Sequence, residues 1–156
     1  MKKILALCLL ASALLISSCR GSKGSTTIKT KPSKKDGIYF VKSESLSAVL
    51  DAAAAENKFV FVDFYTTWCL PCKLMDEEVF PDKAMGKFFK ENFISYKVDA
   101  EKDNGINLAT IFNVGAFPTL LFLDEKGRTV ERNDGSLGYS ALLQMAERAA
   151  AQRPVQ

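Results

Sequence analysis

The chain has 156 residues, which is enough for one domain of ordinary size and a short additional segment. Hydrophobic residues make up 47% and charged residues 25%, close to globular averages, so global disorder is excluded. The net charge of +3 does not indicate nucleic-acid binding. Because the sequence has no histidine, it excludes Ser-His-Asp and Cys-His catalytic sites and any zinc site that needs imidazole, and its four cysteines become the candidate reactive groups.

Residues 1–18 have the pattern of an export signal, with two lysines ahead of an apolar run from Ile4 to Ile16. As a helix this run would span roughly 20 Å, too short for a bilayer core. It ends in Ile16-Ser17-Ser18-Cys19, which resembles the bacterial lipobox. The resemblance implies that residues 1–18 are a lipoprotein signal peptide and that Cys19 becomes lipidated, which would anchor the chain to a membrane. An ordinary secretory signal is the alternative.

Residues 19–36 contain the predicted lipidated cysteine and then a stretch rich in Ser, Thr, Gly and Lys with no apolar period. This composition predicts a flexible tether. Its six basic residues keep it solvated, and attraction to anionic lipid headgroups is a second interpretation. Residues 37–156 are then the predicted folded domain.

The folded domain alternates between strand-like and helix-like patterns. Strands are expected at 38–41, 59–65, 93–98, 120–123 and 129–132, and helices at 45–57, 69–92 with a break near Pro81, 107–112 and 139–151. Residues 124–127 have the composition of a hairpin turn. This order predicts an α/β fold with a central mixed sheet and helices on both faces. No heptad repeat or long exposed apolar strand indicates assembly, so a monomer is expected.

The sequence Trp68-Cys69-Leu70-Pro71-Cys72-Lys73 lies where a buried strand gives way to a helix. The free N–H groups and positive dipole end of a helix stabilise a thiolate, and two intervening residues let the sulfurs bond across one turn. Cys69 is expected to be the exposed nucleophile and Cys72 the resolving thiol. A structural disulfide is one alternative, and a metal site is another that lacks further cysteine or histidine ligands.

Two stretches resemble thioredoxin-fold proteins: Val60 to Tyr65 followed by the two-cysteine motif, and Val114-Gly115-Ala116-Phe117-Pro118-Thr119-Leu120. The similarity covers roughly residues 38–151. It implies that Pro118 is cis and faces the cysteines, that the backbone of Phe117 pairs with an extended substrate peptide, and that Asp63 lies behind Cys72.

Physical chemistry agrees with these roles. Burial in an apolar strand should raise the pKa of Asp63, which would suit it to exchange a proton with Cys72. A hydrogen-bonded carboxylate without a chemical role is the alternative. Trp68 is expected to shield the cysteines and offer a surface to the substrate, although plain packing would also explain it.

The sequence departs from thioredoxin at three places. Leu70-Pro71 stands between the cysteines where thioredoxins have Gly-Pro, which leaves the potential open. The buried lysine of thioredoxin aligns best with Ser95, although Lys97 lies two residues on along the same strand face. Residues 73–82 resemble the periplasmic C-terminal domain of transmembrane disulfide reductases more than they resemble cytosolic thioredoxin.

These features together predict a thiol-disulfide oxidoreductase, lipid-anchored in the bacterial cell envelope and facing the periplasm or exterior, that reduces protein disulfides through Cys69 and Cys72. No cofactor or metal is expected, and a transmembrane electron donor is the expected partner. A disulfide oxidase or isomerase, and a non-catalytic binding lipoprotein of the same fold, remain as alternatives. The substrate, the net direction and the choice of membrane stay open.

Overall fold

The computed structural model describes residues 36–153. Its strands are β1 (Phe40–Val41), β2 (Phe59–Tyr65), β3 (Phe93–Asp99), β4 (Thr119–Leu123) and β5 (Thr129–Asp134). Its helical segments are α1 (Leu46–Ala55), α2 (Leu70–Leu74), the π-helix η1 (Met75–Val79), α3 (Lys83–Asn92), α4 (Asn104–Ile111) and α5 (Tyr139–Ala151). The predicted signal peptide, Cys19 and the tether up to residue 35 lie outside the described residues.

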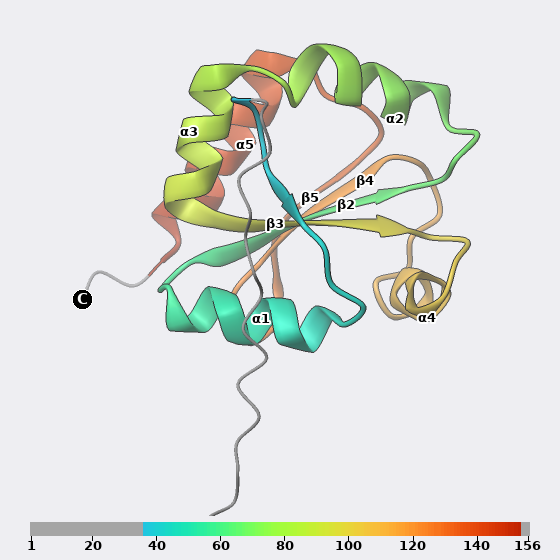
Figure 1. Ribbon diagram of the computed structural model, residues 1–156, viewed down its shortest axis with the longest axis horizontal. Helices are drawn as coiled ribbons and strands as arrows, with labels where there is room; N and C mark the ends of the chain where they lie inside the picture. The colour runs from blue at the N-terminus through green and yellow to red at the C-terminus, as the bar shows by residue number, and fades with distance from the viewer. Residues whose placement is uncertain (1–35, 154–156) are drawn as a thin grey trace, which may run out of the picture.

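The strands form one mixed sheet in the order β1-β3-β2-β4-β5. The first three strands are parallel, β4 runs antiparallel to β2, and β5 closes the expected hairpin against β4. Helices α1 and α4 lie on one side of the sheet, and α2, α3 and α5 lie on the other (Figure 1). The predicted α/β architecture, a mixed sheet with helices on both faces, is confirmed.

Strand β2 is buried on both faces, which explains its almost continuous apolar sequence. Its side chains alternate between two cores because successive strand residues point to opposite faces. Val60, Val62 and Phe64 pack in the core on the α1 and α4 side, and Phe59 and Phe61 pack in the core beneath η1, α3 and α5. Asp63 follows Phe61 by two residues, so β2 directs its carboxylate toward the side of the disulfide-bearing helix.

An aromatic cluster fills the second core. The Phe61 ring lies 5.0 Å from Phe89 and 4.9 Å from Phe122, measured between centroids, and Phe93 lies 4.8 Å from Phe122. Fully burying a side chain of this kind contributes about 1.5–3 kcal/mol. The cluster ties β2, β3, β4 and α3 together toward the end of the sheet where β2 and β3 begin, away from the cysteines.

The predicted helix break near Pro81 is confirmed, but the segment before it differs from the expectation. The backbone N–H of Phe80 bonds to the carbonyl of Met75 at 2.9 Å, a five-residue spacing that makes η1 a π-helix. After the turn, the Asp82 carboxylate accepts from the Met85 N–H at 2.8 Å and caps α3.

Several element boundaries also move by one to three residues, and two of these shifts follow from specific contacts. Strand β1 is shorter than predicted, because the N–H of Ile38 bonds to the carbonyl of Phe80 at 2.8 Å instead of joining the sheet ladder. Helix α4 begins at Asn104, three residues before the predicted start at 107. Its Gly105 packs so tightly that a Cβ there would lie 2.0 Å from the carbonyl oxygen of Asp99, so close packing rather than helix propensity fixes this start.

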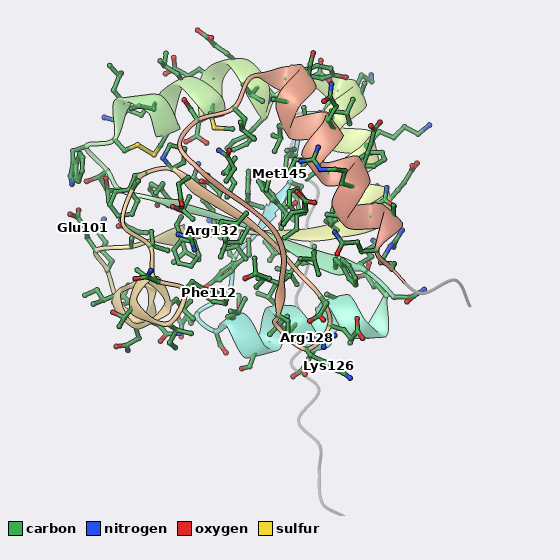
Figure 2. The ribbon with its side chains drawn as sticks, turned by 180° about the vertical axis from the view of Figure 1, so that it is seen from behind. Glu101, Phe112, Lys126, Arg128, Arg132 and Met145 are labelled. Carbon is green, nitrogen blue, oxygen red and sulfur yellow. A yellow bond between two sulfur atoms is a disulfide. The ribbon has the colours of Figure 1, made fainter. Side chains whose placement is uncertain are left out.

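The β4–β5 turn lies beside α1, with Lys126 and Arg128 at its tip (Figure 2). Gly127 adopts a left-handed φ of 76° and sits against the side chain of Leu50. Within residues 36–153, no helix is both long and apolar enough to cross a membrane.

Candidate active site

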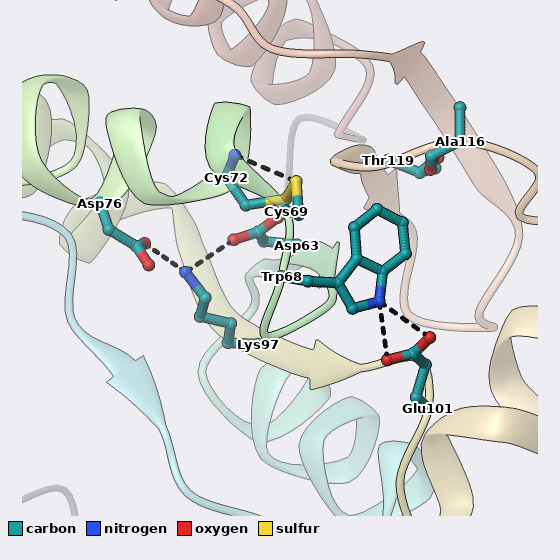
Figure 3. The surroundings of a disulfide bond; sticks show 9 residues. All are labelled: Asp63, Trp68, Cys69, Cys72, Asp76, Lys97, Glu101, Ala116 and Thr119. Atoms are coloured by element: carbon teal, nitrogen blue, oxygen red, sulfur yellow. Dashed lines mark hydrogen bonds and ion pairs between the residues drawn. A yellow bond between two sulfur atoms is a disulfide. The ribbon is translucent and has the colours of Figure 1, made fainter.

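The two cysteines lie directly after β2, at the start of α2, and form a disulfide with an S–S distance of 2.02 Å (Figure 3). Cys69 is the N-cap residue, and its Sγ accepts a hydrogen bond from the backbone N–H of Cys72 at 3.1 Å. Pro71 stands in the first turn of the helix, where a backbone donor is not needed. The sequence prediction of a helix-terminal sulfur pair is confirmed.

The prediction that Cys69 is exposed is wrong for the disulfide form, in which the residue is only 2% exposed. The cause is the capping geometry. The sulfur turns back over the first helical turn, where it bonds to the Cys72 sulfur and accepts from the Cys72 amide. Cys72 is equally buried, as expected for a residue one turn into the helix.

Trp68 stands beside the disulfide and is 65% exposed. Its ring meets the Phe117 ring edge-on, with centroids 5.9 Å apart. Its indole N–H lies 3.0 and 3.1 Å from the two carboxylate oxygens of Glu101, which follows β3 (Figure 3). The exposure excludes plain core packing, and the two contacts fix the indole as an apolar surface next to the sulfurs.

The Phe117–Pro118 peptide bond is cis, as the resemblance to thioredoxins implied. The next residue, Thr119, begins β4 and pairs in register with Phe64 near the end of β2. Because β4 runs antiparallel to β2, its start lies at the sheet edge where β2 ends. The cis-proline and the cysteine motif therefore share one edge of the sheet.

Asp63 is a buried carboxylate on the α2 side of β2, and its side chain is 1% exposed. Burial raises the pKa of Asp63 from 3.8 to about 6, and the ammonium of Lys97 limits that rise. The Lys97 Nζ lies 3.1 Å from Asp63 Oδ2, yet neither Asp63 oxygen makes a well-aligned hydrogen bond to the described residues. A pKa near neutrality lets this group both accept and release a proton under ordinary conditions.

Lys97, rather than Ser95, occupies the place beside the buried carboxylate. In the parallel register Lys97 pairs with Asp63, whereas Ser95 pairs with Phe61. Lys97 also forms an ion pair with Asp76 of η1, so one ammonium bridges two carboxylates (Figure 3). The Lys97 Nζ lies 4.9 Å from the centroid of the Tyr65 ring.

Several residues around the site were not predicted from the sequence. Asp76 and Glu101 reach it only because η1 and the end of β3 fold back onto it, and Thr119 and Arg132 hold the cis-proline segment from the far side. Lys97, by contrast, is noted from the sequence as the alternative to Ser95 on the same strand face. In residues 36–153, no group of three cysteine, aspartate or glutamate side chains is placed to hold a metal ion.

The fold and the site together define the class of protein. A mixed sheet of this order, a CxxC disulfide at a helix N-terminus and a cis-proline at the same edge are the features of a thioredoxin-like protein-disulfide oxidoreductase. Its sulfurs can take up and release two electrons as the disulfide opens and closes, and Asp63 can move a proton beside them.

Comparison with known proteins gives the family. The model of the thioredoxin-like domain family matches residues 46–150, and the chain belongs to this family. The thiol:disulfide interchange protein DsbD of Pseudomonas fluorescens is 29% identical over 70% of this chain, which spans 19% of that protein's length. A thioredoxin of Mycoplasmoides gallisepticum is 32% identical, with 63% of this chain and 91% of the thioredoxin aligned.

Among solved structures, that of a candidate disulphide-isomerase from Bacteroides thetaiotaomicron is 35% identical, with a TM-score of 0.67. The alignment covers 78% of this chain and 100% of that one.

Proposed function

We propose that this chain is a lipid-anchored thiol-disulfide oxidoreductase of the bacterial cell envelope that reduces protein disulfides. The observation that carries the proposal is the Cys69–Cys72 disulfide at a helix N-terminus, on the same sheet edge as cis-Pro118. The envelope location is supported by the lipobox-like sequence ending at Cys19 and by the similarity to DsbD.

In the first step, the Cys69 thiolate of the reduced protein attacks one sulfur of a substrate disulfide. A Cys69–substrate bond forms, the substrate S–S bond breaks, and one substrate sulfur leaves as a thiolate. Trp68 and Phe117 offer an apolar contact surface beside the attacking sulfur, and the backbone next to cis-Pro118 is suited to pair with an extended peptide.

In the second step, Cys72 gives its proton to the Asp63 carboxylate and its sulfur attacks Cys69. The mixed disulfide breaks, the second substrate sulfur leaves and takes up a proton, and the Cys69–Cys72 disulfide remains. The substrate gains two electrons and the protein loses two. A membrane-embedded dithiol donor is the partner we propose for restoring the reduced form, because such a donor would serve a protein anchored outside the cytoplasm.

Insulin reduction with dithiothreitol as the electron source tests the catalytic assignment. We expect turnover by the wild type and the uncatalysed rate for Cys69→Ser. Cys72→Ser retains the nucleophile, so the pre-reduced variant mixed with insulin in the absence of dithiothreitol should accumulate a stoichiometric mixed disulfide, which mass spectrometry detects. Unfolding curves of both variants against the reduced wild type control for folding. Turnover that survives Cys69→Ser would contradict the catalytic role and favour the non-catalytic binding lipoprotein.

Net oxidation or isomerisation is the second candidate function, and the similarity to a candidate disulphide-isomerase favours considering it. The same atoms would serve, and only the potential differs. Equilibration with glutathione buffers distinguishes the two: a potential near about −270 mV supports the reductase and one near about −120 mV supports the oxidase.

A further inference from the structure

The cis-proline segment, residues 113–118, has no regular secondary structure, yet it must hold Phe117 opposite Trp68. Its exposed middle has little support, since a Cβ on Gly115 would meet nothing within 4 Å. The Val114 N–H bonds to the carbonyl of Ala109 at 2.8 Å, and Val114 and Phe117 pack against the first core. The side-chain hydrogen bonds to the two ends of the segment come from the end of β5 and the start of β4.

Arg132 of β5 holds the start of this segment. Its Nη1 donates to the carbonyl of Phe112 at 2.7 Å and its Nη2 to the carbonyl of Asn113 at 3.0 Å. These carbonyls end α4, where the helix leaves its last acceptors without intrahelical partners. Two further donors of the guanidinium bind the Asp134 carboxylate, from Nη2 at 2.8 Å and from Nε at 3.2 Å. Arg132 thus ties the end of α4 to the sheet.

Asp134 and its neighbour hold the end of the segment. The Thr119 hydroxyl lies 2.9 Å from Asp134 Oδ1 and 2.8 Å from the carbonyl of Ala116, and its single proton is shared between these two acceptors. The Gly135 N–H donates to the carbonyl of Pro118 at 2.7 Å. The hydrogen bonds from Arg132 lower the pKa of Asp134, so this carboxylate stays charged and paired with Arg132 at neutral pH.

We propose that Arg132 is a positioning residue that, through Asp134 and Thr119, fixes the Phe117–Pro118 segment for binding of the substrate peptide. This inference rests on the proposed exchange activity. Arg132 touches none of the atoms that react, so its loss should weaken the binding of a polypeptide without changing the chemistry of the sulfurs. Lysine cannot replace it fully, because one ammonium lacks the planar fork that serves two carbonyls and a carboxylate together.

The chain offers a matched control in Arg128. It lies in the same β4–β5 hairpin and grips Asp124 with Nε and Nη2, both at 2.6 Å, but it sits at the turn beside α1. Figure 2 shows Arg128 and Arg132 well separated along the hairpin. Arg128→Gln therefore removes a comparable arginine–aspartate pair without touching the cis-proline segment.

The test compares a protein disulfide with a small one in the purified chain. For Arg132→Gln we expect the KM for insulin to rise roughly five- to tenfold with kcat within about twofold, as for the loss of one or two hydrogen bonds that support binding. Reduction of hydroxyethyl disulfide, which is too small to need the segment, and the equilibrium potential against glutathione should not change. Arg132→Lys should fall in between, and Arg128→Gln should match the wild type in all measurements.

An equal loss with both disulfides, an unchanged KM for insulin, or the same KM change in Arg128→Gln would overturn the proposal. If Arg132→Gln does not fold, Thr119→Val removes the hydroxyl alone. It should then raise the KM for insulin in the same way, while Thr119→Ser should restore it. A wild type that reduces neither disulfide would instead refute the proposed function, so the two failures can be distinguished.

Discussion

At the scale of single residues, the site contains one carboxylate, Asp63, whose burial lowers the stability of the fold. Asp63 is buried in β2 with Lys97 as its nearby counter-charge. In the proposed mechanism this group moves a proton beside the sulfurs, a role that an apolar residue of similar size could not fill.

The cost appears in how stability depends on pH. The pKa of Asp63 is about 6 in the folded chain against 3.8 for the free group, so the folded state binds this proton more tightly. Stability should therefore fall as the pH rises from about 4 to above 6. The difference of about two between the folded and unfolded pKa values corresponds to ~3 kcal/mol. This is the upper limit of the unfolding free energy that Asp63→Asn should add at pH 8. Chemical denaturation at pH 4 and pH 8 measures this gain, which should be much smaller at the lower pH.

Asp124 provides the opposite control. Burial alone would raise its pKa, but hydrogen bonds from Arg128 and from the Lys126 amide prevail and lower it. Its contribution to stability is present above the unfolded pKa and lost as the pH falls, so Asp124→Asn should destabilise the chain at pH 8. A gain in stability from Asp124→Asn, or none from Asp63→Asn, would contradict this account.

A site residue can be predicted from the sequence when it lies within a short recognisable segment, and not when its partners are distant in the chain. Cys69, Cys72 and Asp63 belong to one strand-to-helix segment, and Pro118 lies in a second recognisable segment, so their proximity follows from the resemblance. Arg132 has no local motif, since its partners at the end of α4 lie about 20 residues away in sequence. The burial of Cys69 depends on which way its sulfur turns, which the two-residue spacing does not determine.

At the scale of elements, the predicted limits of a strand or helix match the structure where burial or a terminating residue gives a clear sequence signal. Strand β2 matches its predicted limits because it is buried on both faces, and α5 matches because Gly138 and an amphipathic pattern define it. The π-turn of η1 has no comparable signal, because no proline or glycine lies within it. Its geometry depends on Met75 and Val79 packing into the second core.

Helix α3 gives a prediction at this scale. Asp82→Ala removes the carboxylate that accepts from the Met85 N–H, and should destabilise the chain by about 1 kcal/mol. Asp82→Ser keeps an oxygen acceptor at the cap and should retain most of the stability. Urea unfolding at neutral pH measures both variants, and equal losses from alanine and serine would show that the cap hydrogen bond does not stabilise α3.

At the scale of the whole molecule, the described domain is mounted behind a segment that carries the predicted anchor. In the proposed lipoprotein, residues 20–35 stand between the lipidated Cys19 and the described domain, and a tether of that length would let the disulfide edge reach substrates in solution or at the membrane.

The anchor can be tested with the two cysteines that the fold does not use. In cells, Cys19→Ser should abolish incorporation of labelled palmitate and move the protein from the membrane to the soluble fraction, because two or three acyl chains bind far more strongly than the tether alone. Cys8→Ser, which lies in the predicted signal peptide, should leave both unchanged. Membrane retention of unlabelled Cys19→Ser would refute lipidation as the anchor.

The extra residue in η1 has a consequence for how this segment can change in evolution or by engineering. A π-turn holds one residue more than the α-turn it replaces, and one residue corresponds to about 100° of helical rotation. Deleting Glu77 or Glu78 would let the turn relax to ordinary spacing and re-aim the sulfur-bearing end relative to α3. A one-residue deletion in this turn would therefore change the direction of the cysteine-bearing helix while keeping every side chain that takes part in the proposed exchange.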